Sequence, residues 1–462
     1  MTRIRPILLP LAAVVFGCGL ALIVGRATPL AHATPLAQTA PLVQTAPPDA
    51  KLPAPLGRPT PQQAAWQDLE VGMFLHFGPQ TWQDSEVDLM TTEPSAMNPE
   101  KLDTDQWVRV AESMGARILV FVAKHEGGFC WWQTGTTDFG VRNTPWRGGK
   151  GDVMADLAAS CRTRGMRLGV YLSPQDRKHD VGVGGRAKDA ARQAEYERLF
   201  RQQLTEVLTK YGEMTEVWFD GSLDFEVGDI VARHAPNAVV FQGPHASIRW
   251  VGNEDGFAPS PAWNAVKAPN GKTAWGHYTT ADSDPDGNRW LPIECDARIR
   301  GTWFWRTDNV QTLKTVEHLM DMYYRSVGHG AGLLLNQTPD RTGLIPEADA
   351  ARGAEFGAEI TRRLGTAIAE TRGSGRELTL TLPGPTRIDH VVTMEDIRKG
   401  ERIREYVIEG RVNGEWLKLA AGTAVGHKKI DRVTPTEVTA VRLRVSHAVG
   451  TPQVRRLAVY GQ

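Results

Sequence analysis

The chain has 462 residues, and its 53 Lys and Arg residues balance its 53 Asp and Glu residues. A chain of this length can bury large apolar cores and is expected to form two domains. The charge balance lacks the basic excess of nucleic-acid-binding proteins, so we predict no nucleic-acid partner. The cysteines show neither a disulfide framework nor a zinc-ligand spacing, so the sequence predicts no metal site; they are Cys18, Cys130, Cys161 and Cys295.

Residues 1–33 have the pattern of an export signal. Arg3 and Arg5 precede an apolar run from Ile7 to Val24, and residues 31–33 read Ala-His-Ala, a small-x-small cleavage site. The apolar run is long for a signal peptide, so an uncleaved membrane anchor is the alternative. We expect the protein to be exported and to be periplasmic, secreted or anchored in the cell envelope.

Residues 34–63 form a segment rich in Pro, Ala and Thr, with the near-repeats TPLAQ and APLVQ. Such a segment cannot bury enough apolar surface to offset the entropy that ordering would cost. We interpret it as a flexible, partly extended linker that precedes the body of the protein.

Between residues 64 and 370, short runs of strand-forming residues alternate with helical patterns. We predict strands at Gly72–Gly78, Ile118–Ala123, Arg167–Ser173, Glu216–Asp220, Val239–Gly243, Leu291–Cys295, Thr302–Trp305 and Gly332–Asn336. We predict helices at Thr104–Met114, Asp152–Arg164, Lys188–Lys210, Asp224–His234 and Val310–Val327. Near-continuous apolar strands separated by helices imply a parallel sheet covered on both faces. About eight such units predict a (β/α)8-like barrel, an α/β fold.

Residues 371–462 follow a different pattern. Segments such as ELTLTLP and TAVRLRVS alternate apolar and polar residues with period two, and turn residues separate them without an intervening helix. This pattern predicts a C-terminal antiparallel β-sandwich. By default we expect the sandwich to pack against the barrel.

The stretch Thr215–Asp224 carries the strongest candidate for chemistry. Its strand-forming residues end abruptly at Asp220, and Gly221 allows the backbone to turn. A (β/α)8 barrel places its catalytic groups at the carboxyl ends of the strands, so Asp220 is a candidate nucleophile of a sugar-cleaving enzyme. The alternative is an aspartate that only caps a strand–turn junction.

Polar or aromatic residues follow nearly every other predicted strand as well. They include His76, the run Lys124-His125-Glu126, Tyr171, the run Glu294-Cys295-Asp296, Trp303 and Asn336. Because the carboxyl ends of barrel strands converge on one face, these side chains are expected to form a single site.

A site lined by carboxyl, imidazole and aromatic groups in this way supports the cleavage of glycosides. A retaining mechanism needs two carboxyl groups about 5–5.5 Å apart, one ionised as the nucleophile and one protonated as the acid. Asp220 fits the first role. Glu254 and Glu294 are candidates for the second, and Glu254 is favoured because its loop, with Trp250 and Gly252, can reach over a bound sugar.

From Trp66 onward these residues resemble glycoside hydrolase family 29, the retaining α-L-fucosidases. The matching segments are GMFLHFGP (Gly72–Pro79), VAKHEGGFCWW (Val122–Trp132), Gly149–Arg177, YGEMTEVWFDG (Tyr211–Gly221), RWVGNEDGFAP (Arg249–Pro259), ECDARIRGTWFW (Glu294–Trp305) and Tyr323–Ile345. The resemblance implies a (β/α)8-like barrel followed by a β-sandwich, a fucosylated oligosaccharide or glycoconjugate as substrate, and no metal or organic cofactor.

The resemblance also implies roles for single residues. Asp220 matches the family nucleophile, and His76 and His125 match histidines that hold the fucose hydroxyls. Tyr171 matches an aromatic residue at the third strand tip, and Trp303 resembles the wall that faces the sugar's methyl group. The blocks around Glu254 and Glu294 resemble the branch that cleaves α-1,3/1,4-linked fucose, in which Glu254 would be the acid/base.

The chain departs from the family at two positions of this site. Glu126 stands where the family has a fucose-contacting histidine, and Gln175 stands where the branch often has a tryptophan. A carboxylate in the pocket can change which hydroxyl pattern is bound or raise the pKa of a neighbour. The nucleophile and the reaction class survive these departures. The alternative is a glycan-binding protein on the same fold, with a weakened or altered site.

Overall fold

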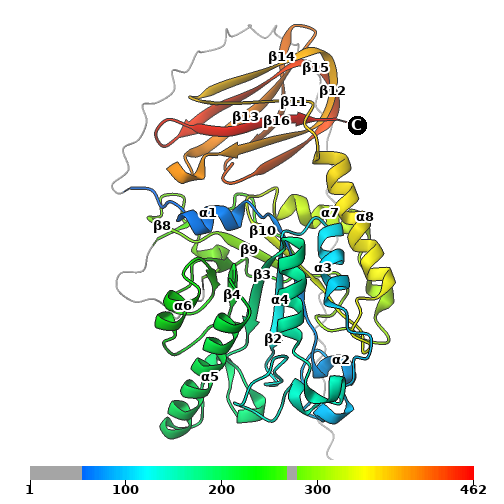
Figure 1. Cartoon of the computed structure of the whole chain (residues 1–462). Helices are drawn as coiled ribbons and strands as arrows, with labels where there is room; N and C mark the ends of the chain where they lie inside the picture. Colours follow the sequence, from blue (N-terminus) through cyan, green and yellow to red (C-terminus); the bar gives the residue numbers. More distant parts are fainter. Residues whose placement is uncertain (1–54, 268–277, 462) are drawn as a thin grey trace, which may run out of the picture. The chain divides into compact units, whose positions relative to one another are not determined.

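The computed structural model describes residues 55–267 and 278–461. The predicted export segment 1–33 and residues 34–54 of the predicted linker lie outside the described residues. No helix within the described ranges is long and apolar enough to cross a membrane. The described chain forms a barrel followed by a C-terminal sheet, coloured from blue to red in Figure 1.

Eight parallel strands form the barrel, in the order β5-β4-β3-β2-β1-β10-β9-β6. They are β1 (Val71–Leu75), β2 (Ile118–Lys124), β3 (Arg167–Leu172), β4 (Glu216–Trp218), β5 (Val239–Phe241), β6 (Arg249–Trp250), β9 (Ile293–Arg298) and β10 (Gly332–Gln337). A parallel bridge between Phe241 and Ile248 joins β5 to the residue before β6. The barrel is therefore nearly closed, and the predicted fold class is confirmed.

The barrel strands are buried on both faces, which explains their near-continuous apolar sequences. Every residue of β1 and β2 is buried. Inward-facing side chains form one apolar cluster that includes Phe74, Val120, Val122, Tyr171, Trp218, Phe241 and Leu334. Outward-facing side chains form a second, larger cluster with the helices. Gly169 of β3 leaves room inside, because a Cβ there would lie 3.1 Å from Cβ of Glu216.

Most of the helices cover the outer surface of the barrel, whereas the first lies at its amino-terminal end (Figure 1). They are α1 (Pro61–Gln67), α2 (Pro79–Gln83), α3 (Thr104–Ser113), α4 (Val153–Arg164), α5 (Ala190–Lys210), α6 (Gly228–His234), α7 (Val316–Arg325) and α8 (Glu347–Leu364). Asp103, Asp152 and Asp189 cap the first turns of α3, α4 and α5 by accepting backbone N–H bonds. The prediction did not include α1, α2 or α8, and α1 begins at Pro61, within the segment 34–63 that was interpreted as a linker.

Two of the predicted strands were placed wrongly. The Thr302–Trp305 run is a loop, in which the Trp303 N–H donates to the Glu86 carboxylate instead of pairing in the sheet. The sixth barrel strand is β6, in a segment that the sequence analysis treated as the loop carrying Glu254. The predicted strand at Leu291–Cys295 corresponds to β9, which takes the seventh position. Aromatic β-propensity misled here because contacts with neighbouring loops decide these conformations.

The C-terminal domain is a six-stranded antiparallel sheet in the order β11-β16-β12-β15-β13-β14. Its strands are β11 (Ala369–Ser374), β12 (Glu377–Glu395), β13 (Ile403–Val412), β14 (Glu415–Gly422), β15 (Lys429–Ala448) and β16 (Gln453–Tyr460). The pairing of the long strands β12 and β15 shifts register twice, and residues from both halves of β12 meet in one apolar core. A separate two-stranded ribbon, β7 (Ala265–Val266) and β8 (Arg289–Trp290), precedes β9.

The sheet contacts the amino-terminal end of the barrel. Lys428 forms a 2.7 Å ion pair with Glu70, which directly precedes β1. His390 lies 2.8 Å from the hydroxyl of Tyr324 in α7. These contacts place the sheet at the end of the barrel opposite the carboxyl ends of the strands. Because catalytic groups sit at the carboxyl ends, the sheet supports the barrel from the other side.

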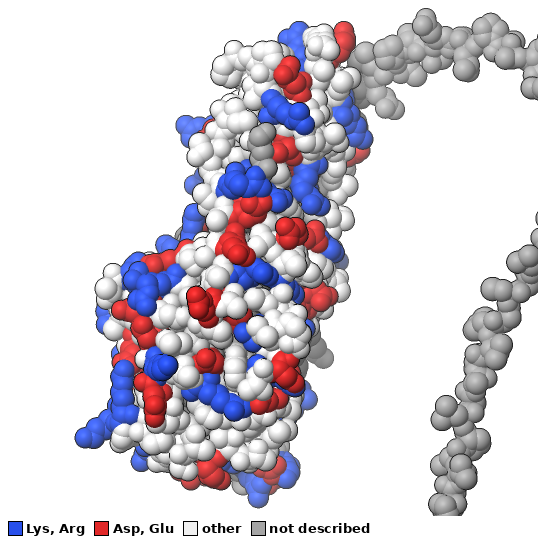
Figure 2. All heavy atoms as spheres, turned by 90° about the vertical axis from the view of Figure 1, so that its right-hand side faces the viewer, with Lys and Arg blue, Asp and Glu red and all other residues white. Residues whose placement is uncertain are grey.

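Positive and negative side chains are mixed on one face of the molecule. Figure 2 shows Lys and Arg interspersed with Asp and Glu over the face that it draws. Many of these side chains pair at the surface, as Arg362 does with Glu359 at 2.6 Å. The absence of a nucleic-acid partner remains a prediction from the charge balance.

Lys124→Met should destabilise the barrel more than the loss of a surface ion pair does. Lys124 and Asp176 form a 3.1 Å ion pair in which both side chains are fully buried. Removing Lys124 leaves the Asp176 charge buried without its partner, which lowers the free energy of unfolding by about 3–5 kcal/mol. We expect a lower midpoint of urea unfolding. Arg109→Met, which breaks the exposed pair with Asp103, is the control and should shift the midpoint much less. Equal shifts would contradict the proposed cost of burial.

Candidate active site

A small cavity opens at the carboxyl ends of the barrel strands. Its volume is about 250 Å³, below that of a typical drug-sized pocket, which suits a small ligand. It is lined by Phe74, His76, Glu86, Val87, His125, Glu126, Tyr171, Trp218, Asp220, Glu254, Asp296 and Trp303. The fold thus brings together Asp220, Glu254, His76, His125, Glu126, Tyr171 and Trp303. Of the residues that the sequence analysis expected at this site, Glu294, Lys124, Cys295 and Asn336 do not line the cavity.

Asp220 lies two residues beyond the end of β4, at the mouth of the cavity. The backbone turns sharply after it, because Gly221 and Ser222 both adopt left-handed conformations, with φ values of 66° and 69°. Its side chain is exposed, and its Oδ2 accepts a 2.8 Å hydrogen bond from the hydroxyl of Tyr171. Burial, together with the charge of Asp220, raises the pKa of Tyr171 well above its usual value, so the phenol remains a donor.

A stack of aromatic rings fixes the position of Tyr171. Its ring is parallel to His125 on one side, with ring centroids 5.6 Å apart, and to Trp218 on the other, at 5.3 Å. Trp218 in turn stacks on Phe241, with centroids 3.8 Å apart. Four rings from β5, β4, β3 and the end of β2 therefore hold the hydroxyl that contacts Asp220.

His76 presents a hydrogen-bond acceptor to the pocket. Its Nδ1 lies 2.7 Å from Oδ1 of Asn336, whose Nδ2 donates to the carbonyl of Trp303 at 2.8 Å. Because the Asn336 oxygen must accept, Nδ1 of His76 carries the proton. Burial lowers the pKa of His76 well below its usual value, so the ring is neutral and Nε2 is an acceptor.

His125 has the opposite polarity. The side-chain amide of Gln80 donates to its Nδ1 at 3.0 Å. Burial lowers the pKa of His125 to about 3, so the ring is neutral and the remaining proton lies on Nε2. The two histidines, with ring centroids 5.7 Å apart, therefore offer a ligand one acceptor and one donor. Sugar hydroxyls, which both donate and accept, match such a pair.

Glu254 is held against the aromatic wall of the pocket. The indole N–H of Trp303 donates to its Oε2 at 3.1 Å, and the Arg298 guanidinium lies 3.5 Å from the same oxygen. Arg298 also covers the Trp303 ring, 5.5 Å from its centroid. The backbone N–H of Trp303 donates to Glu86 at 2.9 Å. These contacts connect the loops that follow β6 and β9.

Glu126, the departure from the family pattern, is built into one corner of the pocket. Its Oε2 lies 3.1 Å from the guanidinium of Arg177. Its Oε1 accepts a 3.2 Å bond from the backbone N–H of Asp88. The carboxylate is therefore fixed in place and charge-paired, with its side chain only 13% exposed.

Sequence reasoning did not assign roles to Glu86 and Asp296, which both line the pocket. Glu86 lies on a loop after α2, where no strand-tip signal could have pointed to it. Burial raises its pKa despite the nearby Arg298. Asp296 lies on β9, two residues beyond Glu294, and burial raises its pKa to about 7.

Glu294, the alternative acid, does not lie in the pocket. Side chains two residues apart on β9 share the inner face, but are about 6.6 Å apart along the strand, so Glu294 lies one layer below Asp296. It accepts a 2.8 Å bond from the indole of Trp218 and is hydrogen-bonded to Glu216. Glu216 accepts a 2.8 Å bond from the indole of Trp66. Because side chains alternate between the two faces of a strand, Glu294 points inward like Asp296 but lies deeper, in the barrel core.

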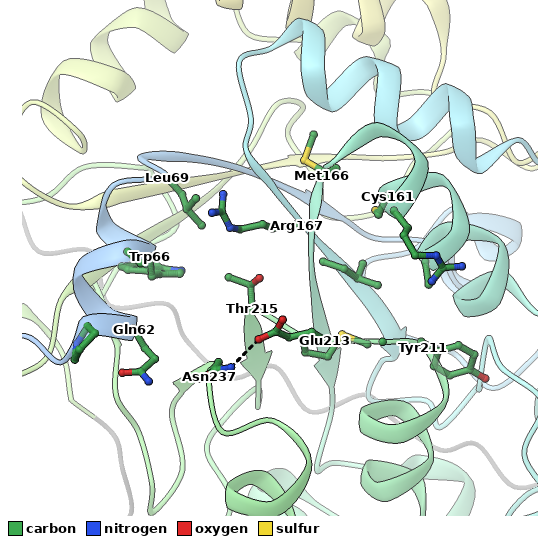
Figure 3. Close-up of a pocket in the computed structure, with 17 residues that line it drawn as sticks. Gln62, Trp66, Leu69, Cys161, Met166, Arg167, Tyr211, Glu213, Thr215 and Asn237 are labelled. Carbon is green, nitrogen blue, oxygen red and sulfur yellow. Dashed lines mark hydrogen bonds between the residues drawn. The ribbon is translucent and has the colours of Figure 1, made fainter.

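A larger cavity, of about 520 Å³, opens at the amino ends of β3 and β4 (Figure 3). It is lined by apolar side chains such as Trp66 and by Arg162, Arg167 and Glu213, whose carboxylate accepts a 2.9 Å bond from Asn237. In such barrels the catalytic groups lie at the carboxyl ends of the strands, not at the amino ends where this cavity opens. Size alone therefore does not locate the site.

Comparisons with known proteins agree with this geometry. The model of the alpha-L-fucosidase family matches residues 91–362. The chain belongs to the alpha-L-fucosidase family. Alpha-L-fucosidase 1 of Arabidopsis thaliana is 32% identical over 450 residues, which cover 87% of each chain. The predicted family and reaction class are thus confirmed, and the protein is a glycoside hydrolase.

Solved fucosidase structures share the fold. A glycoside hydrolase 29 family member from an unknown rumen bacterium has a TM-score of 0.79 and 32% identity, over 88% of this chain and 78% of that one. A Ruminococcus gnavus GH29 fucosidase solved in complex with fucose has a TM-score of 0.78 and 26% identity, over 90% and 97%. Within the described ranges, no cluster of three or more His, Cys, Asp or Glu side chains could hold a metal ion.

Glu294→Gln should reduce the dependence of fucosidase stability on pH. Burial raises the pKa of Glu216 to about 7, and that of Glu294 well above its usual value. The folded state therefore keeps protons that the unfolded state loses above about pH 4.5, so stability falls as pH rises through about 7. An amide cannot ionise and can still accept from Trp218. We expect Tm to fall less for the variant than for wild type between about pH 5 and pH 8; parallel curves would contradict the buried acid pair.

Proposed function

We propose that the protein is an exported, retaining exo-α-L-fucosidase that hydrolyses terminal α-L-fucosyl linkages of glycans. The observation that carries the proposal is the Asp220 carboxylate, which is held by the Tyr171 hydroxyl in a cavity that also contains Glu254. Residues 1–33 support export by their sequence pattern.

In the first step Asp220 attacks the anomeric carbon of the fucosyl group, and the bond to the leaving oxygen breaks. Glu254 gives its proton to that oxygen, so the aglycone leaves as an alcohol. The Tyr171 hydroxyl orients the attacking carboxylate through its bond to Oδ2 of Asp220. The product of this step is a fucosyl ester of Asp220.

In the second step the Glu254 carboxylate takes a proton from water, which attacks the same carbon and releases Asp220. Two displacements on opposite faces restore the configuration of the anomeric carbon. The Trp303 indole, which donates to Glu254 at 3.1 Å, keeps the carboxyl aimed across the pocket through both steps.

The pocket supports recognition of a single terminal sugar. Its small volume suits one pyranose ring, and the neutral histidines His76 and His125 offer complementary hydrogen bonds to hydroxyls. The Trp303 ring supplies an apolar wall for a methyl group. The sequence blocks around Glu254 and Glu294 favour the α-1,3/1,4 linkage, and the fixed Glu126 carboxylate would select the hydroxyl pattern at its corner.

Asp220→Ala should abolish turnover of an aryl α-L-fucoside, by a factor of at least about 10³, because the covalent step loses its nucleophile. Initial rates of 4-nitrophenol release measure the effect, and circular dichroism checks the fold. Added azide should restore release and give an azide of inverted configuration. Near-normal activity of the variant would overturn the assignment, and the absence of any turnover by wild type would favour a glycan-binding role.

Glu254→Gln should affect poor leaving groups most, because only these need the proton. We expect kcat/KM to fall about 10²-fold or more on a fucosylated oligosaccharide, and much less on a 4-nitrophenyl fucoside. Asp255→Asn, which changes an exposed neighbour on the same loop, is the matched control. Equal losses of Glu254→Gln on both substrates would place the acid elsewhere.

A further inference from the structure

Asp296 is a pocket carboxyl group that the two-carboxylate mechanism does not use. It lies on β9, with its side chain facing the cavity, and the residue is only 4% exposed. The indole N–H of Trp250 donates to its Oδ1 at 2.7 Å. Among the described residues, no other side chain donates a hydrogen bond to it. Its own backbone N–H also donates to the carboxyl group, and the side chain lines the cavity, where a ligand can reach it.

The charged groups around Asp296 are mostly of its own sign. Asp220 and Glu254 face it from the ends of β4 and β6, and Glu294 lies one layer below on β9. From the end of β1, the neutral His76 also lines the pocket. The Arg298 guanidinium, two residues along β9, lies beside Glu254 and Glu86.

We propose that Asp296 is a third functional carboxyl group, which in its protonated form donates a hydrogen bond to a hydroxyl of the bound sugar. This inference rests on the proposed function and deepens it. A carboxylic acid has one donor and one acceptor, whereas a carboxylate only accepts. Oδ1 accepts the bond from Trp250, so in the protonated acid Oδ2 carries the proton. Asp296 would then be a second hydrogen-bond donor to the sugar hydroxyls, besides Nε2 of His125.

Neutrality at Asp296 also protects the charge of the nucleophile. An ionised Asp296 would add a negative charge close to the Asp220 carboxylate, and like charges disfavour each other's ionisation. Burial keeps the pKa of Asp296 near 7, so the proton is held below neutral pH and lost above it. Activity should therefore fall as pH rises, because the donor becomes a repelling acceptor.

The test is the pH profile of kcat/KM on 4-nitrophenyl α-L-fucoside. This leaving group needs little protonation, so loss of the Glu254 proton contributes little to the fall at high pH. For wild type we expect kcat/KM to fall about tenfold per pH unit once the pH exceeds the pKa of Asp296. Asp296→Asn keeps an acceptor for Trp250 and a donor for the sugar but cannot ionise. It should keep kcat/KM within a fewfold at about pH 6 and lose the alkaline fall.

Two further variants keep the test decisive. Asp296→Ala should lower kcat/KM at every pH, mainly through KM. Trp250→Phe removes a bond that favours the ionised form, so the fall should move to higher pH even if Asp296→Asn does not fold. The exposed Asp255→Asn should leave the profile unchanged.

The outcomes separate this inference from the function beneath it. Turnover by wild type, with the same alkaline fall in Asp296→Asn or an unmoved fall in Trp250→Phe, would overturn only the role of Asp296. The absence of turnover by wild type would overturn the proposed function and this inference with it.

Discussion

The hydrogen bond from Tyr171 to Asp220 is the contact on which the site depends. The geometry of this bond depends on the position of the Tyr171 phenol, which is stacked between the rings of His125 and Trp218. Each ring comes from a neighbouring parallel strand, so the spacing of the strands sets the stack. The hydrogen-bonded strands therefore fix the position of the Asp220 carboxylate through the stacked rings. Rigid elements position such a group more precisely than a loop does.

Beneath this stack the barrel interior is polar where an apolar layer would be expected. Glu216 and Glu294 are buried together, each receiving an indole N–H, from Trp66 and Trp218 respectively. Such a pair is tolerated only while a proton is shared, because two buried carboxylates without a cation would repel each other. The same Trp218 lines the pocket, so its bond to Glu294 orients one wall of the pocket from below.

The C-terminal sheet contributes to this arrangement from the opposite end. Its contacts with Glu70 and with Tyr324 of α7 involve the amino-terminal side of the barrel. Stability and chemistry are thus assigned to different ends of the same strands. Because of this division, a change in the loops at the carboxyl ends need not disturb the supporting core.

The sequence by itself determined the alternation of strands and helices, the C-terminal sheet and the nucleophile candidate Asp220, because each is a local pattern of side chains. Only the tertiary structure placed Glu254 in the pocket and Glu294 outside it, brought Glu86 into the pocket, and turned the strand-like run Thr302–Trp305 into a loop. Those outcomes depend on which layer of a closed barrel a side chain occupies and on contacts between distant loops. Neither is encoded in the spacing of neighbouring residues.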